Sequence, residues 1–164
     1  MTSSEVPKGE AVMKQTMDMQ AVQDRMQPGK LTAEGFLGTD ARNLQDILLA
    51  DQETVNRLGL THGQIADRMQ AITDIGKRMT EALLPLAEGF AVQVDEYMGT
   101  IPCPFADNHR ADKRNTLVKN LATGAAVHWT DLSIHMIRMH GFYEGIGSYF
   151  RLDPAYLVAF LPKP

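Results

Sequence analysis

Cysteine is nearly absent from this sequence: Cys103 is the single one among 164 residues, so no internal disulfide can form. No apolar run approaches the ~18 residues that a transmembrane helix needs. Residues 1–30 contain no apolar stretch of the kind that marks a secretory signal. Basic excess is missing too, because 16 Lys and Arg face 20 Asp and Glu for a net charge of −4. This charge balance disfavours a dedicated nucleic-acid-binding protein. From the single cysteine and the lack of a long apolar run, we expect a protein of the reducing cytoplasm without a membrane segment.

The composition that is present is that of a globular domain. Apolar residues make up 44% and charged residues 22% of the chain, close to the average for folded proteins. A domain of this length buries enough surface to fold without a disulfide or a structural metal. No repeat of fixed period and no low-complexity block is visible.

The first 35 residues differ from the rest. Turn signals stand at residues 7–9 (Pro-Lys-Gly) and 28–30 (Pro-Gly-Lys), and the helix-favouring segment between them carries only a thin apolar stripe that includes several methionines. We interpret residues 1–35 as a flexible or partner-docking N-terminal tail and residues 36–164 as a single domain. Flexible methionine side chains suit a contact with a partner or a second subunit.

Two helices are expected before any strand. The first begins at Thr39 or Asp40 and extends to Leu58, although Asp51 in its middle also suits the start of a second short helix. The second is predicted over residues 61–84. Its apolar residues alternate in steps of four and three, which is the pattern of a helix that packs against another helix; they are Ile65, Met69, Ile72, Gly76, Met79 and Leu83. This helix and the Met-bearing tail are the surfaces we expect to contact a protein partner or a second copy of the chain.

After Gly89 the apolar period changes to two, which predicts strands at 90–94, 115–121 and 125–129, with a tight turn at 123–124. A helix capped by Thr130 or Asp131 follows and ends near Met139. A last helix begins after Asp153-Pro154. The predicted fold class is α+β: a helical half of two or three helices, then a small antiparallel sheet with two C-terminal helices.

The residues best suited to metal binding gather in 103–144, which holds the single cysteine and four of the five histidines. Cys103 and His109 lie in one predicted loop, and His135 and His140 lie on or just past the next helix. Zinc sites often combine two ligands from a turn with two from a helix, so these four residues form a candidate zinc site. A separation of five residues turns a helix through about 500°, which would place His135 and His140 about 140° apart around an intact helix. We therefore expect the helix to end at Arg138 or Met139, so that both rings can converge.

Two enzymatic alternatives use the same residues. Cys103 with a neighbouring His135 or His109 would form a nucleophile and its base, with Asp107 or Asp131 orienting the ring. Alternatively, a zinc ion held by these residues would take part in catalysis. A binding or interaction protein remains the first expectation, and whether the chain is an enzyme stays open.

Four charged residues are candidates for binding a ligand. Arg110 and Arg114 cluster in the segment 107–114, where arginine forks suit an anion. Glu144 and Arg151 stand in a segment rich in glycine and aromatic residues, of a type that often lines pockets.

A further alternative is DNA binding. Residues 60–69 (Leu-Thr-His-Gly-Gln-Ile-Ala-Asp-Arg-Met) resemble the opening of a helix-turn-helix motif. The resemblance ends after Met69, because the turn of that motif is missing and the helical pattern continues. Nucleic acid is therefore not an expected partner.

Overall fold

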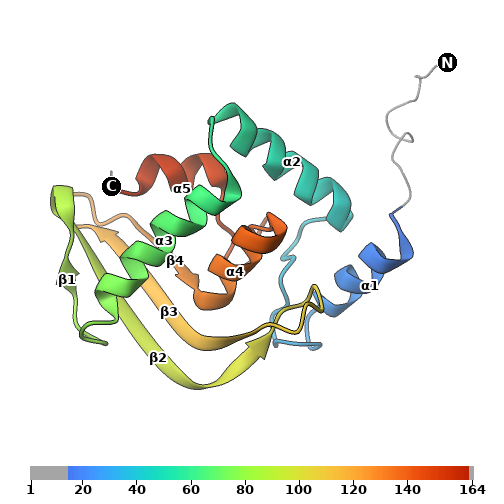
Figure 1. Cartoon of the computed structure of the whole chain (residues 1–164), viewed down its shortest axis with the longest axis horizontal. Helices are drawn as coiled ribbons and strands as arrows, with labels where there is room; N and C mark the ends of the chain where they lie inside the picture. The colour runs from blue at the N-terminus through green and yellow to red at the C-terminus, as the bar shows by residue number, and fades with distance from the viewer. Residues whose placement is uncertain (1–14, 163–164) are drawn as a thin grey trace.

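The computed structural model describes residues 15–162. Three helices come first along the chain, a four-stranded antiparallel sheet follows, and two helices end it, which confirms the predicted α+β class (Figure 1). The elements are α1 (Met17–Arg25), α2 (Leu44–Arg57), α3 (His62–Gly76), β1 (Leu84–Pro85), the short 3-10 turn η2 (Ala87–Gly89), β2 (Phe90–Pro102), β3 (Arg110–Asn120), β4 (Ala126–Thr130), α4 (Asp131–His140) and α5 (Pro154–Phe160).

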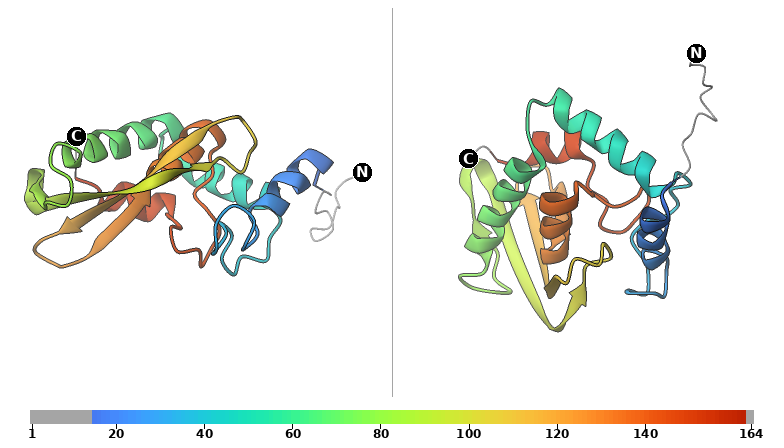
Figure 2. Two further views of the ribbon diagram at one scale, coloured as in Figure 1. Left: turned by 90° about the horizontal axis from the view of Figure 1, so that it is seen from below. Right: turned by 45° about the vertical axis from the view of Figure 1, so that its right-hand side comes forward.

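The sheet is a simple meander in which each strand pairs with the next along the chain, in the order β1-β2-β3-β4. The turn at 123–124 joins β3 to β4 as predicted, with Val118 opposite Val127. Strands β2 and β3 are long and curve around the helices, and α3 and α4 lie against the concave side (Figures 1 and 2). The register of β2 with β3 shifts between Tyr97 and Thr100, where the hairpin bends. This bend carries the loop at 103–109 toward α1 and α4.

The apolar side chains form two clusters. One lies between α3, α4, α5 and the sheet, and is centred on Trp129, whose indole Nε1 donates a hydrogen bond to Thr73 Oγ1 at 2.9 Å. The other lies between α1, α2, α4 and the loop at 103–109, and contains Cys103, Met136 and Phe142. Met26 and Val22, from the segment that the sequence marks as a tail, are buried in this second cluster.

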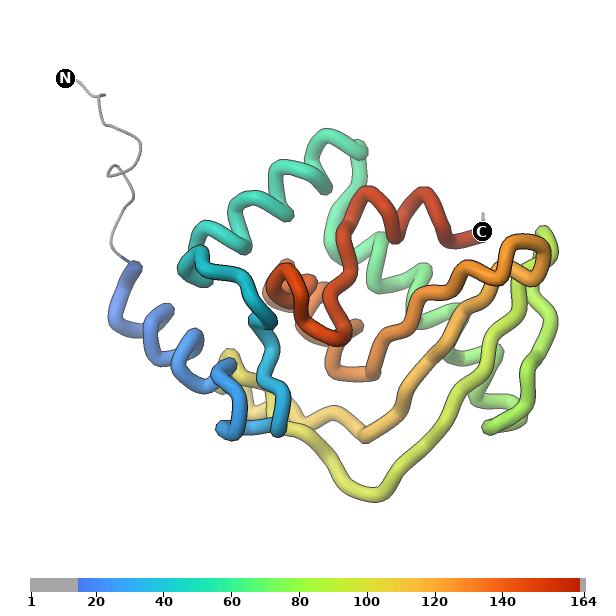
Figure 3. Tube along the Cα trace, turned by 180° about the vertical axis from the view of Figure 1, so that it is seen from behind, coloured from blue at the N-terminus to red at the C-terminus, as the bar shows by residue number. Residues whose placement is uncertain are grey.

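Segment 15–35 also contacts the domain through polar groups. Arg25 Nε donates a hydrogen bond to the Pro104 carbonyl at 2.7 Å, and the Gln23 side chain accepts one from the Leu44 amide at 2.9 Å. Helix α1 lies beside the loop that joins β2 to β3 (Figures 1 and 3). Residues 1–14 of the expected tail lie outside the described residues. The division of the chain into a tail at 1–35 and a domain at 36–164 stays a prediction.

Helix α3 is shorter than the apolar pattern predicts. The expected end at Leu84 is wrong, because the helix ends at Gly76. Gly76 packs directly against Val94 of β2 with no room for a Cβ. Glu81 then takes a left-handed backbone (φ 69°), and its amide bonds the Val94 carbonyl at 2.8 Å, so the chain turns back along the sheet. Met79 and Leu83 are consequently exposed.

Three other expectations also need correction. The first helix does not begin at Thr39 or Asp40, because Asn43 is its N-cap and α2 begins at Leu44. Asp51 does not start a second helix, because α2 is continuous and Asp51 lies buried in its middle. The segment 107–114 is a loop only in its first part, since β3 begins at Arg110. Within residues 15–162, no helix is long and apolar enough to cross a membrane.

Candidate metal centre

The loop at 103–109, between β2 and β3, carries two of the predicted metal ligands, Cys103 and His109. The Cys103 amide bonds the His109 carbonyl at 2.9 Å and closes the loop. Asp107 Oδ1 accepts a hydrogen bond from the His109 amide at 3.0 Å, which fixes the carboxylate against its own backbone. Ala106 and Asn108, on either side of Asp107, both have a left-handed backbone (φ 57° and 67°). Such backbone positions in non-glycine residues are uncommon, and they often mark a functional loop.

Helix α4 supplies the other side chains. Its first turn is fixed by a capping box between Thr130 and Ser133, and its last residue is His140, followed by Gly141 in the left-handed conformation. The helix therefore extends one or two residues further than expected. His135 and His140 nevertheless reach the same point. Each imidazole is long enough to reach it from its own side of the helix.

That point is the Asp107 carboxylate. His135 Nε2 and His140 Nε2 each lie 2.7 Å from Asp107 Oδ2. Both rings thus direct Nε2 at one carboxylate oxygen, and an ionised Asp107 accepts a hydrogen bond from each.

Two aromatic rings from the loop hold the histidines in place. Phe105 stacks on His140 with ring centroids 4.0 Å apart and planes 7° from parallel. His109 stacks on His135 with centroids 3.7 Å apart and planes 5° from parallel. Each histidine of the helix is therefore fixed by a ring and by a hydrogen bond, both from the loop.

Cys103, Asp107, His135 and His140 form the candidate metal centre: one ligand atom from each lies within 4.8 Å of all the others. The four ligand atoms of a tetrahedral zinc ion stand about 3.3–3.8 Å apart, given zinc–ligand distances of roughly 2.0–2.3 Å. Shifts on the order of 1 Å would bring the four side chains to that spacing. Sulfur, nitrogen and carboxylate oxygen are all ligands that zinc accepts.

The electrostatics of the cluster suit a cation. Burial raises the pKa of the Cys103 thiol to about 12, and the nearby Asp107 charge adds to this, so the thiol is protonated at neutral pH without a metal. Burial also acts to raise the pKa of Asp107, but hydrogen bonds from His140, the His109 amide and His135 outweigh it and hold that pKa well below its usual range. Burial lowers the pKa of His135, which favours the neutral ring that a metal requires.

The structure brings together three of the four predicted metal ligands, Cys103, His135 and His140. The fourth, His109, stacks on His135 instead of joining the set. Asp107 takes that place, four residues after Cys103. The sequence signal for Asp107 was its position in the same loop as Cys103, but an aspartate in a mixed-charge segment is easily interpreted as a solvated residue.

The four predicted ligand-binding residues lie in two places, Arg110 and Arg114 on β3 and Glu144 and Arg151 after α4. Arg110 lies at the start of β3, and Arg114 forms ion pairs with Glu96 (2.9 Å) and Asp131. Glu144 is buried and accepts a hydrogen bond from the Ser148 hydroxyl at 2.5 Å.

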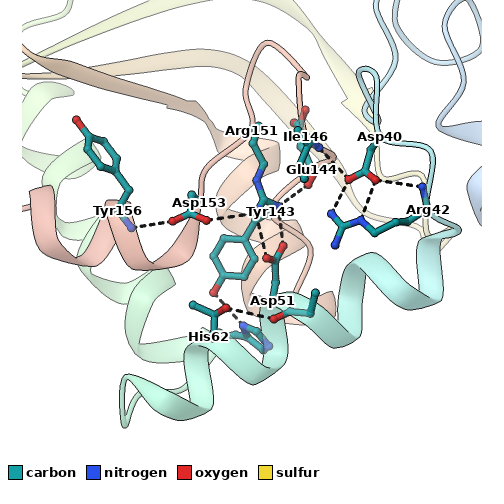
Figure 4. A network of polar contacts seen from close by, with 12 residues as sticks. Asp40, Arg42, Asp51, His62, Tyr143, Glu144, Ile146, Arg151, Asp153 and Tyr156 are labelled. Carbon is teal, nitrogen blue, oxygen red and sulfur yellow. Dashed lines mark hydrogen bonds and ion pairs between the residues drawn. The ribbon is translucent and has the colours of Figure 1, made fainter. Parts of the chain in front are cut away.

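Arg151 and Glu144 belong to one polar network between α2 and the segment after α4, in which Arg151 Nη1 donates to the Glu144 carbonyl at 2.8 Å (Figure 4). The Arg151 guanidinium makes a two-bond ion pair with the buried Asp51, at 2.6 and 3.0 Å. Beside it, His62 Nδ1 lies 2.9 Å from the Tyr143 hydroxyl (Figure 4). These contacts connect α2 and α3 to the C-terminal segment, and they explain the burial of charged residues without a ligand.

No protein-family model, no curated protein and no solved structure matches this chain. The candidate function therefore depends on the site itself.

Proposed function

We propose that this protein binds a divalent transition metal, zinc by its ligand types, at Cys103, Asp107, His135 and His140. The observation that carries the proposal is the convergence of four metal-ligating side chains, from a loop and from a helix, within 4.8 Å of one another. Zinc accepts this mixture of sulfur, nitrogen and oxygen, whereas magnesium and calcium prefer oxygen alone.

The state of Cys103 favours metal binding over nucleophilic catalysis. A nucleophilic cysteine needs a thiolate and access to its substrate. The Cys103 side chain is buried and its pKa is raised to about 12, so little thiolate exists at neutral pH. A bound zinc ion would deprotonate the thiol by coordination.

Metal analysis of the full-length protein, purified without an affinity tag, tests the proposal. We expect about one zinc per chain, retained through dialysis. Cys103→Ser, Asp107→Asn, His135→Gln and His140→Gln should each lower the zinc affinity by at least about tenfold, because each removes or weakens one ligand.

Two matched controls sharpen this experiment. His128→Gln removes a histidine of β4 that bonds the Tyr149 carbonyl and lies outside the centre, so zinc affinity should not change. His109→Gln separates the ligand set predicted from sequence from the set found in the structure. A greater loss with His109→Gln than with Asp107→Asn would contradict the assignment of Asp107. Wild-type protein without bound zinc, and unable to take it up, would overturn the proposal.

The buried free thiol of Cys103 fits the reducing cytoplasm as the proposed location. Contact with a protein partner or a second copy, expected through residues 61–84 and the Met-bearing tail, also remains part of the proposal. The apolar residues Ile65 and Met69 are buried in the protein's own core, whereas Met79 and Leu83 stay exposed after the helix. Any such contact would therefore use the segment after α3 rather than the helix itself.

A further inference from the structure

A cleft of about 700 Å³ opens beside the candidate metal centre. Helix α4 forms one wall through residues 131–139, and the loop and the start of β3 form the other through residues 107–112. Asp107 and His135 belong to both the centre and the cleft, whereas Cys103 and His140 do not line the cleft. The centre therefore faces the cleft through its carboxylate and one imidazole.

Asp107 is the most exposed of the four ligands. Its side chain is 26% exposed, against 13% for His135 and 20% for His140, and Cys103 is buried. A carboxylate at the open side of a centre can shift or leave while the three buried or stacked ligands stay in place. Catalytic zinc sites have this composition, with three protein ligands and one position for water or substrate.

The charges along the cleft favour an anion next to that position. Arg110 Nε donates to Thr100 Oγ1 at 2.8 Å, and its guanidinium forms no ion pair with any residue between 15 and 162. The two other acidic residues of the cleft, Asp112 and Asp131, both lie against Arg114. A zinc ion with one thiolate and one carboxylate is formally neutral. Arg138 is already paired with Asp67 at 2.6 Å, so Arg110 supplies the available positive charge at the entrance.

From this arrangement we infer that the metal centre is open to the cleft and that its exchangeable position takes an oxyanion, the carboxylate or phosphate group of a small-molecule substrate. This inference rests on the proposed metal site. Arg110 recognises the anion, because a guanidinium fork matches the two oxygens of a carboxylate or phosphate. Asp107 is the ligand that yields the position, and Cys103, His135 and His140 keep the metal bound.

The full-length protein loaded with cobalt(II) in place of zinc tests the inference, since cobalt(II) in a four-coordinate site has visible absorption bands that report its ligands. Inorganic phosphate and acetate are titrated separately. We expect at least one of them to change these bands saturably, and the stronger response identifies the preferred oxyanion. Arg110→Gln should weaken that response by about tenfold, the effect of losing one charge-assisted contact. Arg57→Gln, on the exposed surface of α2, is the matched control and should leave it unchanged.

The possible failures are distinguishable. Cobalt bands that neither anion alters would overturn the open position while leaving the metal site intact. An anion response that Arg110→Gln does not weaken would overturn the assigned recognition by the cleft. Wild-type protein that takes up neither cobalt nor zinc would overturn the proposed function itself.

Discussion

His140 Nε2 lies 2.7 Å from Asp107 Oδ2, although the two residues stand 33 positions apart in the chain. His135 contacts the same oxygen at the same distance. One carboxylate therefore ties the loop between β2 and β3 to both histidines of α4. This arrangement holds the ligands near one another before any metal binds, which lowers the cost of ordering them on binding.

The first prediction concerns Asp107 in the metal-free protein. Asp107→Asn should lower the free energy of unfolding at pH 7 by about 1 kcal/mol, because charge-assisted hydrogen bonds from two histidines are lost at a partly solvated site. Urea unfolding in the presence of a chelator measures this. Asp112→Asn, whose ion contact with Arg114 is 3.8 Å long, should cost less than about 0.5 kcal/mol. Equal costs for the two variants would show that the contacts of Asp107 contribute no more to stability than the exposed contact of Asp112.

The second prediction concerns Gly141, which ends α4 directly after His140. Its φ is +64°, and an added Cβ would lie 2.6 Å from His62 Nε2. Gly141→Ala should therefore destabilise the protein by about 2–4 kcal/mol, from backbone strain together with overpacking.

Gly59→Ala is the matched control, because Gly59 also follows a helix with a left-handed backbone (φ +73°) but has open space around it. That variant should cost only the backbone term, about 1–2 kcal/mol. Thermal or urea unfolding of both variants separates the two contributions. A Gly141→Ala variant no less stable than Gly59→Ala would contradict the close contact with His62.

The third prediction concerns the ion pair between Asp51 and Arg151, whose side chains are 7% and 15% exposed. Asp51→Asn and Arg151→Met should each cost about 3–5 kcal/mol, since each leaves a buried group without its partner. The double variant should cost clearly less than the sum of the two. A urea double-mutant cycle measures the difference, and strictly additive costs would show that the pair is not coupled.

Much of the fold is predictable because local signals agree with the tertiary structure. Thr61, Thr130 and Asp153 stand at the predicted starts of three helices, and each accepts an N-cap hydrogen bond from the backbone. The alternating residues from Phe90 to Val94 form the strand they predict. There are two exceptions: helix α2 begins later than expected, at Leu44, and helix α3 ends earlier than expected. Its apolar pattern continues past Gly76, but contact with β2 ends the helix there, and a local pattern carries no information about such a contact.

The candidate metal centre was only partly predictable for a related reason. Ligand types and spacing identify Cys103, His135 and His140 as candidates, but they do not tell whether Asp107 or His109 points at the other three. The loop decides this. Its left-handed backbone at Ala106 and Asn108 directs the carboxylate of Asp107 toward α4, while the ring of His109 stacks on His135. Asn108 is of a residue type that tolerates this backbone, but Ala106 is not, so the sequence gives only a weak signal for the conformation of the loop.

The last prediction concerns Glu144, which is 4% exposed. Burial raises the pKa of Glu144 to about 7, although the hydroxyl of Ser148 and the charge of Arg151 oppose the shift. In the unfolded chain the pKa of a glutamate is about 4.3. Because the folded-state pKa is the higher one, the folded protein binds this proton more tightly than the unfolded chain does. The stabilisation is fully present below about pH 4.3 and is lost as the pH rises through about 7.

Urea unfolding at pH 5, 6, 7 and 8 measures this effect by comparison with Glu144→Gln, which keeps the size of the side chain and a hydrogen-bond acceptor for Ser148. Relative to the variant, the wild type should lose about 2–3 kcal/mol of stability between pH 5 and pH 8. Glu53→Gln, on the exposed surface of α2, is the control and should follow the wild type at every pH. A constant difference between wild type and Glu144→Gln across this range would show that Glu144 is ionised throughout, and that Ser148 and Arg151 suffice to hold its charge in the folded protein.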